Sequence, residues 1–243
     1  MSRADESTVQ VHVLIPAAGR GTRYGGAVLK QYLPVCGKAV LVHAIRAFQF
    51  HPLIKGITVI LAEDDQWFDS AVGPLSGAVE TVIGGDTRAQ SVRNGLRFVA
   101  ENYPETDWVL IHDAARPCLS PGSLDRLLEQ GLRSEDGAIL AMPVGDTLKR
   151  AGGAGEITAT VDRSGLWAAQ TPQLFPVTAL TDAIDAAQQD GRELTDEASA
   201  MEFIGARPKL VMGSAANIKI THPSDLAIAE AWLRWSNLEP GQS

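Results

Sequence analysis

The chain is predicted to be an α/β protein with a mostly parallel sheet flanked by helices, and three features of its 243 residues support this. Short apolar runs alternate with segments in which apolar residues recur every three or four positions, as in βα units. The runs are apolar at successive positions, which is typical of strands covered on both faces. A glycine-rich stretch follows the first run, at the sheet edge where such proteins bind nucleotides.

The alternation can be followed from the first apolar run to residue 142. Strands are predicted where a short run ends at glycine, proline or polar residues, over residues 11–15, 57–62, 78–83, 108–112 and 138–142. Between them, the spacing of apolar side chains predicts helices over residues 39–50, 64–72, 89–99 and 120–132. We expect Asp86 to cap the third of these helices, and Ser120, followed by a proline, to open the fourth.

Residues 143–166 interrupt this alternation with a proline and several glycines, while residues 157–161 alternate like an exposed ribbon. So long an excursion from a compact domain is usually functional. Two interpretations stay open, a projecting β arm that embraces a second subunit and a mobile loop. Residues 9–236 are expected to form one domain, with frayed tails at 1–8 and 237–243.

Composition excludes several classes of protein. The net charge of −8 argues against binding to nucleic acid or to an anionic membrane, because such proteins are normally basic. Cys36 and Cys118 are far apart and lack metal-ligand spacing, which argues against a disulfide framework or a zinc site. Residues 1–10 are polar, unlike a signal peptide, and no apolar run reaches membrane length. We therefore expect a cytoplasmic protein.

The loop after the first strand carries Gly19, Gly21, Arg23 and Lys30 and is the most informative stretch of the chain. Glycines let the backbone approach a ligand closely, so that its N–H groups can face phosphate, and the two cations can neutralise phosphate charge. The loop lacks the Walker pattern, and Tyr24 stands where the dinucleotide fingerprint needs Gly or Ala. A nucleotide site of another kind is predicted, and a plain glycine-rich surface loop is the alternative.

Two further polar clusters follow predicted strands. Gly85, Asp86 and Ser91 come after the third strand, where Gly85 and the helix N-terminus could receive a base or ribose. For Asp86, capping the helix and contacting the nucleotide are equally favoured. Asp113 and Arg116 come after the fourth strand, where a carboxylate could hold Mg²⁺ or a hydroxyl. An internal ion pair between these two residues is the alternative.

His112 directly precedes Asp113 and, on a strand, points to the opposite side, so we expect a hydrogen-bonded structural histidine. The other histidines have no metal-like spacing. The sequence contains no Gly-x-Ser-x-Gly elbow and no plausible Cys-His pair. It therefore offers no obvious candidate for covalent catalysis.

Short motifs, taken in order along the chain, resemble the 2-C-methyl-D-erythritol 4-phosphate cytidylyltransferase family. The matching segments are residues 16–23, 30–32, 84–92, 112–117, 146–149, 161–167, 170–173, 195–197 and 217–221. Each match is weak by itself, and their specificity lies in their number and order over residues 13–226. Two residues depart from the family pattern: Leu29 replaces the proline that usually precedes the loop lysine, and Tyr24 replaces Met or Phe. Leu29 would loosen the loop.

The resemblance implies a Rossmann-like nucleotidyltransferase fold with a projecting β arm. It implies transfer of CMP from CTP to 2-C-methyl-D-erythritol 4-phosphate, which gives 4-CDP-2-C-methyl-D-erythritol and pyrophosphate in the non-mevalonate route to isoprenoids. The substrate phosphate would attack the α-phosphorus of CTP in line, with Mg²⁺ bridging phosphate oxygens. The arm at residues 143–166 would join two subunits into a homodimer and complete the active site.

The resemblance also implies roles for residues that match the family's motifs. Transition-state stabilisation would fall to Arg23, Lys30 and Lys219. Nucleotide binding would fall to Ala17, Ala18, Gly19, Gly21, Gly85, Asp86, Arg88 and Ser91. The sugar phosphate would be held by Asp113, Arg116, Thr147, Arg163, Thr171 and Asp196. Asp113 is also a candidate Mg²⁺ ligand, the alternative being a metal held by the CTP phosphates, and for Asp196 capping of the helix through Phe203 is equally favoured.

Three other functions stay open. A cytidylyltransferase for another polyol phosphate, such as ribitol 5-phosphate, shares much of this signature, although the segment around Arg163 favours methylerythritol phosphate. A non-catalytic nucleotide sensor on the same fold is opposed by retention of the transition-state cations. A nicotinamide-dependent oxidoreductase is opposed by the incomplete glycine fingerprint.

Overall fold

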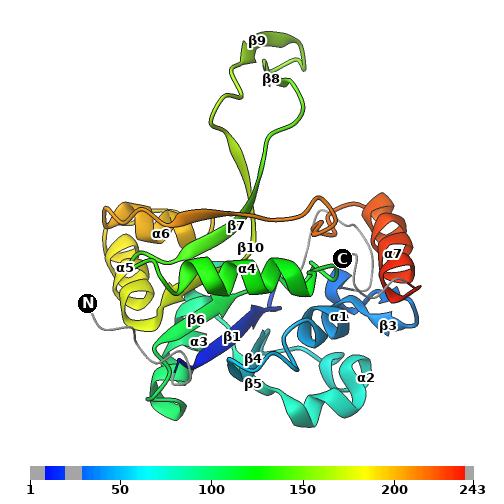
Figure 1. The fold of residues 1–243 in the computed structure, drawn as a ribbon, viewed down its shortest axis with the longest axis vertical. Coiled ribbons are helices and arrows are strands. Elements are labelled where there is room, and N and C mark those ends of the chain that lie inside the picture. The colour runs from blue at the N-terminus through cyan, green and yellow to red at the C-terminus, as the bar shows by residue number, and fades with distance from the viewer. Residues whose placement is uncertain (1–8, 20–28, 239–243) are drawn as a thin grey trace.

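A seven-stranded sheet runs through the computed structural model, which describes residues 9–19 and 29–238 (Figure 1). In spatial order its strands are β11 (Lys209–Met212), β7 (Ala138–Pro143), β10 (Trp167–Pro176), β6 (Trp108–Ile111), β1 (Val11–Pro16), β4 (Ile54–Leu61) and β5 (Glu80–Ile83). Strand β10 runs antiparallel to β6 and β7, and the other neighbouring pairs are parallel. The predicted α/β architecture with a mostly parallel sheet is confirmed.

Helices pack on both faces of the sheet. They are α1 (Val40–Arg46), α2 (Phe68–Val72), α3 (Arg88–Asn102), α4 (Pro121–Gly131), α5 (Val177–Gln189) and α6 (Glu197–Phe203), whereas α7 (Pro223–Leu238) packs in a separate, smaller core. In β1, Val13 and Ile15 belong to the core formed with α1, α2 and α4, whereas Leu14 belongs to the core formed with α3, α5 and α6. All three side chains are completely buried, which is why apolar residues follow one another over Val13–Ile15 instead of alternating with polar ones.

A third, smaller core joins α7 to the region that leads into the candidate site. It contains Val35 and Val40, together with Ile220 and Ala229. Val35 belongs to a short antiparallel ribbon formed by β2 (Pro34–Val35) and β3 (Lys38–Ala39). This ribbon follows η1 (Lys30–Tyr32), a 3₁₀ helix of one turn. This packing anchors the end of the glycine-rich loop at Lys30.

Several element boundaries differ from the prediction. Helix α1 ends at Arg46, because residues 47–50 turn back to begin β4 at Ile54. Helix α2 begins at Phe68, because the Asp65 carboxylate accepts hydrogen bonds from the N–H groups of Trp67 and Phe68 and holds the preceding residues in a turn. A 3₁₀ segment, η2 (Gly73–Ala78), delays β5 until Glu80.

The start of α3 corrects the capping prediction for Asp86. Thr87 is the capping residue, and its hydroxyl oxygen accepts from the N–H of Gln90 at 3.1 Å. Threonine competes well for this position because its hydroxyl can reach the third backbone N–H of the helix. At α4 the expected cap is present, with the hydroxyl of Ser120 accepting from the N–H of Ser123.

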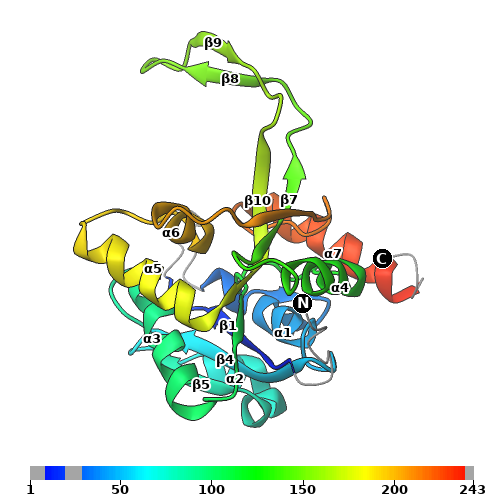
Figure 2. The same ribbon diagram turned by 60° about the vertical axis from the view of Figure 1, so that its left-hand side comes forward.

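The excursion at residues 143–166 forms a hairpin that projects from the body of the molecule (Figures 1 and 2). Strands β7 and β10 form its base, and β8 (Leu148–Ala151) pairs antiparallel with β9 (Ile157–Val161) near its tip. Most of its side chains are exposed, with Ile157 at 67%. We call residues 143–166 the arm.

Some predictions concern residues outside the described part of the chain. The expected tail at 1–8 and the segment 20–28, which includes Gly21 and Arg23, are among them. The expected C-terminal tail is partly described, because α7 continues through Leu238. Across the described residues, the helices are too short or too polar to cross a bilayer.

Candidate active site

A cavity of about 820 Å³ opens at the carboxyl edge of the sheet, among the described residues. The loops that follow β1, β4, β5 and β6 line it, and Lys30 and Lys219 complete its wall. Parallel strands bring their carboxyl ends to the same edge, so residues distant in sequence meet there. The lining residues include ten of those predicted to act: Ala17, Ala18, Gly19, Lys30, Gly85, Asp86, Arg88, Ser91, Asp113 and Lys219.

One wall of the cavity is built from small residues and backbone. A Cβ atom on Gly84 would lie 2.7 Å from the hydroxyl oxygen of Ser91 and 3.0 Å from the methyl of Ala18, so only glycine lets these two loops approach so closely. The hydroxyl of Ser91 accepts from the N–H of Gly85 at 3.0 Å. The buried amide of Gln31 donates to the carbonyl of Ala17 at 2.7 Å. The two loops therefore lie close together in this part of the lining, and hydrogen bonds hold them in place.

Another part of the lining, formed by Arg88, Asp113 and Lys219, belongs to a group of ionised side chains around Asp113. Its Oδ1 lies 3.3 Å from Nη2 of Arg88, and its Oδ2 lies 2.9 Å from Nζ of Lys219 and 3.4 Å from Nε of Arg116. Arg88 also forms a two-point ion pair with Glu197, at 2.5 and 3.1 Å. We call Arg88, Asp113, Arg116, Glu197 and Lys219 the charge cluster.

Electrostatics inside the cluster keep Asp113 ionised. Burial by itself would raise the pKa of Asp113, but the positive charges of Arg88, Lys219 and Arg116 outweigh burial and hold that pKa well below its usual range. The ion pair with Arg116, given above as an alternative for Asp113, is thus present. Both carboxylate oxygens already face cationic groups.

The described part of the chain does not fit a protein-built site for a divalent cation. It contains no group of three or more His, Cys, Asp or Glu side chains that could hold a metal ion. Asp113 would have to exchange cationic neighbours for the metal, because both of its oxygens are engaged. Magnesium also keeps several waters and commonly uses substrate phosphates as ligands.

The two lysines differ in their surroundings. Lys219 keeps 42% of its side chain exposed while it pairs with Asp113. Lys30 donates from Nζ to the carbonyl of Ile220 at 3.1 Å, one residue beyond Lys219 in the chain. The backbone N–H of Ile220 in turn donates to the carbonyl of Ala115. These bonds tie the end of the glycine-rich loop to the segment that carries Lys219.

A buried chain of hydrogen bonds supports Asp113 from behind. The N–H of Asp113 donates to the hydroxyl of Thr171 at 3.0 Å, and that hydroxyl donates to Nδ1 of His112 at 3.0 Å. The other ring nitrogen of His112 donates to the carbonyl of Arg116 at 3.0 Å. Burial lowers the pKa of His112 to about 4. The histidine is neutral and structural, as predicted, and Thr171 lies behind Asp113.

Asp196 lies away from the cavity lining, at the start of α6. Its carboxylate caps the helix by accepting from the N–H of Ser199 at 2.9 Å, which is the alternative stated above. It also accepts from the amide of Gln173 at 2.9 Å, and the carbonyl oxygen of that amide accepts from the N–H of Ala198. Asp196 thereby fixes the helix that presents Glu197 to Arg88.

Thr147 and Arg163 lie on the arm and are exposed. They do not line the cavity, and the guanidinium of Arg163 donates to the carbonyl of Gly145 within the arm. The structure therefore does not bring these two predicted residues together with the charge cluster of the same chain. Gly21 and Arg23 lie outside the described residues.

Three buried polar residues that hold the site together were not among the site residues predicted from the sequence. Glu197 pairs with Arg88, while the amide of Asn217 donates to the carbonyl of Thr171 at 2.7 Å. Gln170 donates to the carbonyl of Ser214 at 2.9 Å, in the segment that leads to Lys219. All three lie in motifs noted above, and the only local signal was a charged or amide side chain within a largely apolar region.

Comparisons with known proteins agree with one another. A family model described as IspD, 2-C-methyl-D-erythritol 4-phosphate cytidylyltransferase, matches residues 11–235. A protein of that name from Tolumonas auensis is 47% identical over 226 residues, 93% of this chain and 97% of that protein. A protein of the same name from Dechloromonas aromatica is 46% identical over 225 residues, 92% of this chain and 97% of that protein.

Two solved structures show the same architecture. One, a 4-diphosphocytidyl-2C-methyl-D-erythritol synthase, is 43% identical with a TM-score of 0.81, over 93% of this chain and 99% of that chain. The other, a 2-C-methyl-D-erythritol 4-phosphate cytidylyltransferase from Thermus thermophilus, is 34% identical with a TM-score of 0.78, over 93% of this chain and 100% of that chain.

Proposed function

This chain belongs to the 2-C-methyl-D-erythritol 4-phosphate cytidylyltransferase family, and we propose that it performs the reaction by placing cations around the reacting phosphates, without a general base. It is a cytidylyltransferase of the non-mevalonate isoprenoid pathway. The observation that carries the proposal is the cavity in which Lys30, Arg88 and Lys219 surround a space of about 820 Å³.

The chemistry requires charge compensation more than proton transfer. In this reaction a phosphate oxygen of the sugar phosphate attacks the α-phosphorus of CTP in line and pyrophosphate leaves. Both partners are anionic, so their repulsion must be cancelled and the charge that develops on the α-phosphate stabilised. The nucleophile is already ionised, and His112, the histidine nearest to Asp113 in sequence, has both ring nitrogens engaged. A general base is therefore not required.

We assign Lys30 and Lys219 to the α-phosphate, together with Arg23. An ammonium group has three N–H donors, so Lys219 can keep its bond to Asp113 while donating to a phosphate oxygen. Asp113 positions Lys219 and, with Arg116, faces the sugar phosphate and its hydroxyls. We assign the triphosphate contacts to Gly19 and Gly21, because glycine permits close approach of the backbone to phosphate; Gly21 lies outside the described residues.

The part of the lining that is built from small residues and backbone suits a pyrimidine. We assign cytosine recognition to Ala17, Ala18, Gly85, Asp86 and Ser91, because small residues and backbone groups leave room for one ring and offer hydrogen bonds to its edge. We assign Mg²⁺ to the phosphate oxygens of CTP, since the described side chains do not build a metal site. Bound there, the metal neutralises phosphate charge.

The arm supplies the remaining substrate contacts in this proposal. Thr147 and Arg163 are exposed and are absent from the cavity lining of their own chain, and the arm that carries them projects from the body of the molecule (Figure 2). We propose that two chains form a homodimer in which each arm brings Arg163 to the sugar phosphate in the partner's cavity. We place the enzyme in the cytoplasm, where its two small-molecule substrates would be available.

The test is pyrophosphate release from CTP and Mg²⁺, with 2-C-methyl-D-erythritol 4-phosphate and ribitol 5-phosphate supplied separately. Release with the first alone supports the proposal. Preference for ribitol 5-phosphate would assign the chain to the sister activity. Binding of CTP without release from either substrate would favour a nucleotide sensor.

A further inference from the structure

Glu197 is a buried carboxylate to which the proposed reaction assigns no role, and we propose that it is a positioning residue for Asp113 and Lys219, acting through Arg88. Its side chain is 3% exposed and forms the two-point ion pair with Arg88 described above. Arg88 lines the cavity and reaches Asp113 with its remaining contact at 3.3 Å. The inference rests on the proposed function, because it concerns the same site.

The fold holds Glu197 in place from two sides. It is the first residue of α6, directly after the capping residue Asp196, and Gln173 of β10 binds both Asp196 and the N–H of Ala198. Burial raises the pKa of Glu197, and the guanidinium of Arg88 opposes that rise. A buried carboxylate is costly unless it is paired with good geometry, and here both of its oxygens face Arg88. A side chain with only a packing role would not need this charge.

The charge of Glu197 decides how Arg88 is shared. With Glu197 ionised, the cluster contains three cations (Arg88, Arg116, Lys219) and two anions (Asp113, Glu197), an excess of one positive charge. Two of the three hydrogen bonds from Arg88 go to Glu197, and only one goes to Asp113. Oδ2 of Asp113 therefore stays engaged with Lys219 at 2.9 Å and with Arg116.

Removing the charge of Glu197 would change both the net charge of the cluster and the distribution of hydrogen bonds from Arg88. The excess would become two positive charges, which attracts the triphosphate more strongly. Arg88 would lose its main anionic partner and turn toward Asp113 or the nucleotide, which weakens the hold of Asp113 on Lys219. Nucleotide affinity and turnover should thus change in opposite directions, a result that loss of folded protein cannot produce.

The experiment compares Glu197→Gln with the wild-type enzyme, using CTP and Mg²⁺ as the probe in titration calorimetry and full turnover in the pyrophosphate assay. We expect the Kd for CTP to fall roughly threefold to tenfold and kcat to fall roughly tenfold or more, the scale of one misplaced electrostatic donor. The calorimetric stoichiometry corrects kcat for the folded fraction. Wild-type values of both constants, or weaker CTP binding together with lower kcat, would overturn the proposal.

Three further variants make the result specific. Glu202→Gln removes a charge from the exposed face of the same helix and should leave both constants unchanged. Glu197→Asp keeps the charge with a shorter side chain, so CTP affinity should stay near the wild-type value even if Glu197→Gln folds poorly. Arg88→Lys keeps the positive charge but lacks the planar guanidinium that binds both oxygens of Glu197. We therefore expect kcat to fall while CTP affinity does not increase. Tighter binding in any of these variants would contradict the charge argument.

Failure of this inference can be told apart from failure of the proposed function. Absence of pyrophosphate release from the wild-type enzyme would refute the function, whereas the change in CTP affinity needs no turnover. A wild-type enzyme that is active and a Glu197→Gln variant with unchanged CTP affinity would refute the inference alone.

Discussion

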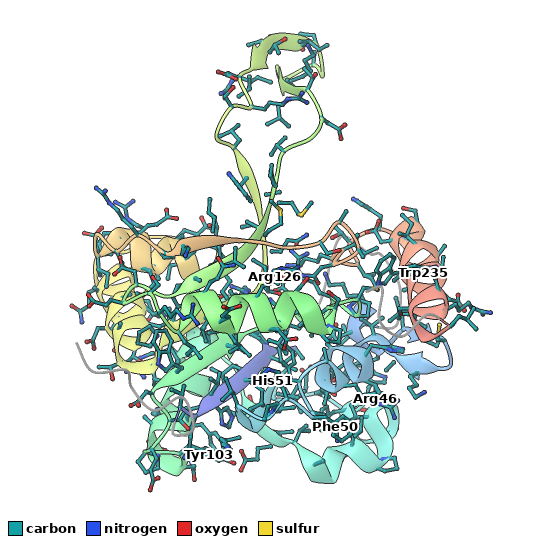
Figure 3. All side chains as sticks on the ribbon, viewed as in Figure 1. Arg46, Phe50, His51, Tyr103, Arg126 and Trp235 are labelled. Carbon is teal, nitrogen blue, oxygen red and sulfur yellow. The ribbon has the colours of Figure 1, made fainter. Side chains whose placement is uncertain are left out.

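The charge cluster and the arm are built in opposite ways. In the cluster, side chains from α3 and from the segments after β6 and β11 pair with Asp113, α6 contributes Glu197 as the partner of Arg88, and a buried hydrogen bond to Thr171 supports Asp113. The arm projects from the body of the molecule (Figure 3), and the guanidinium of Arg163 donates to the carbonyl of Gly145 within the arm. One chain therefore contains every residue of the charge cluster, but it does not bring Thr147 and Arg163 of the arm to the cavity.

The proposed reaction thus depends on the fold of one chain at the cluster and on association of two chains at the arm. Substitutions in the charge cluster should change the activity of the cavity in the same chain, because all of their partners lie there. Substitutions in the arm should change the activity only of the cavity in the other chain of the dimer.

Lys30→Ala should lower kcat by about 10²- to 10³-fold, with a smaller loss of CTP affinity, because one electrostatic donor to the transition state is removed. Steady-state kinetics with both substrates measure the effect. Lys55→Ala, at an exposed position at the start of β4, is the matched control and should leave kcat unchanged. Undiminished turnover in Lys30→Ala would remove this residue from the mechanism.

Thr171→Val and Thr160→Val compare the same substitution in the two regions. Thr171→Val leaves the N–H of Asp113 and Nδ1 of His112 without their buried partner, which should cost about 2–4 kcal/mol of unfolding free energy. Thr160→Val removes an exposed bond to Lys149 on the arm and should cost less than about 0.5 kcal/mol. Denaturant unfolding measures both, and equal costs would contradict the contrast.

Stability in acid should depend on the buried His12 of the body. Burial lowers the pKa of His12 from 6.5 to about 4, so below pH 6.5 the unfolded chain takes up a proton that the folded chain does not. The contribution is complete above about pH 7 and is lost as pH falls from 6.5 toward 4, by about 1–3 kcal/mol. In His12→Phe, unfolding free energy should depend less steeply on pH in this window.

The quantity that tests His12 is the slope of the unfolding free energy against pH, and not the unfolding free energy at one pH. His12→Phe also removes a hydrogen bond to Thr58, so it should be less stable than the wild type at neutral pH. The slope of the wild-type protein, measured under the same conditions, is the reference. An unchanged slope in His12→Phe would show that other groups account for acid sensitivity.

Arg163→Ala should raise the KM for the sugar phosphate by roughly tenfold, the scale of one lost charge-assisted contact, with little change in CTP affinity. If Arg163 acts across a dimer, random mixing with Lys30→Ala protein should restore up to about a quarter of wild-type activity through hybrid dimers. Each hybrid has one cavity with Lys30 faced by an intact arm. No recovery, with mixed dimers verified by native mass spectrometry, would place Arg163 in its own chain's site.

Local patterns predicted much of the fold and part of the candidate site. The continuous apolar run of β1 and the glycines after it led to the cavity, because strand pattern and loop composition are properties of neighbouring residues. Asp113 was found by the same reasoning, since polar residues after buried strands collect at one sheet edge. Its ion pair with Arg116 is local in sequence and was an alternative from the start.

Other features could not be predicted from neighbouring residues. Strand β10 is buried over residues that include Gln170 and Thr171, and their polar side chains are tolerated only because distant groups bond to them. The pairing of Arg88 with Glu197 joins residues 109 positions apart. The cap of α3 was assigned to Asp86 instead of Thr87, since the two adjacent residues are both good capping types.

From the sequence we predicted five strands of the sheet, the helices between them, the glycine-rich loop and the set of cations and carboxylates available for chemistry, while the projecting arm was one of two open interpretations of residues 143–166. These depend on hydrophobic period, backbone freedom and charge, which act over a few residues. Only the tertiary structure decided which carboxylate each cation meets, because ion pairing depends on distances across β6, β10, α3 and α6. It placed Asp113 among three cations and paired Arg88 with Glu197, and the positioning role that we propose for Glu197 rests on this arrangement.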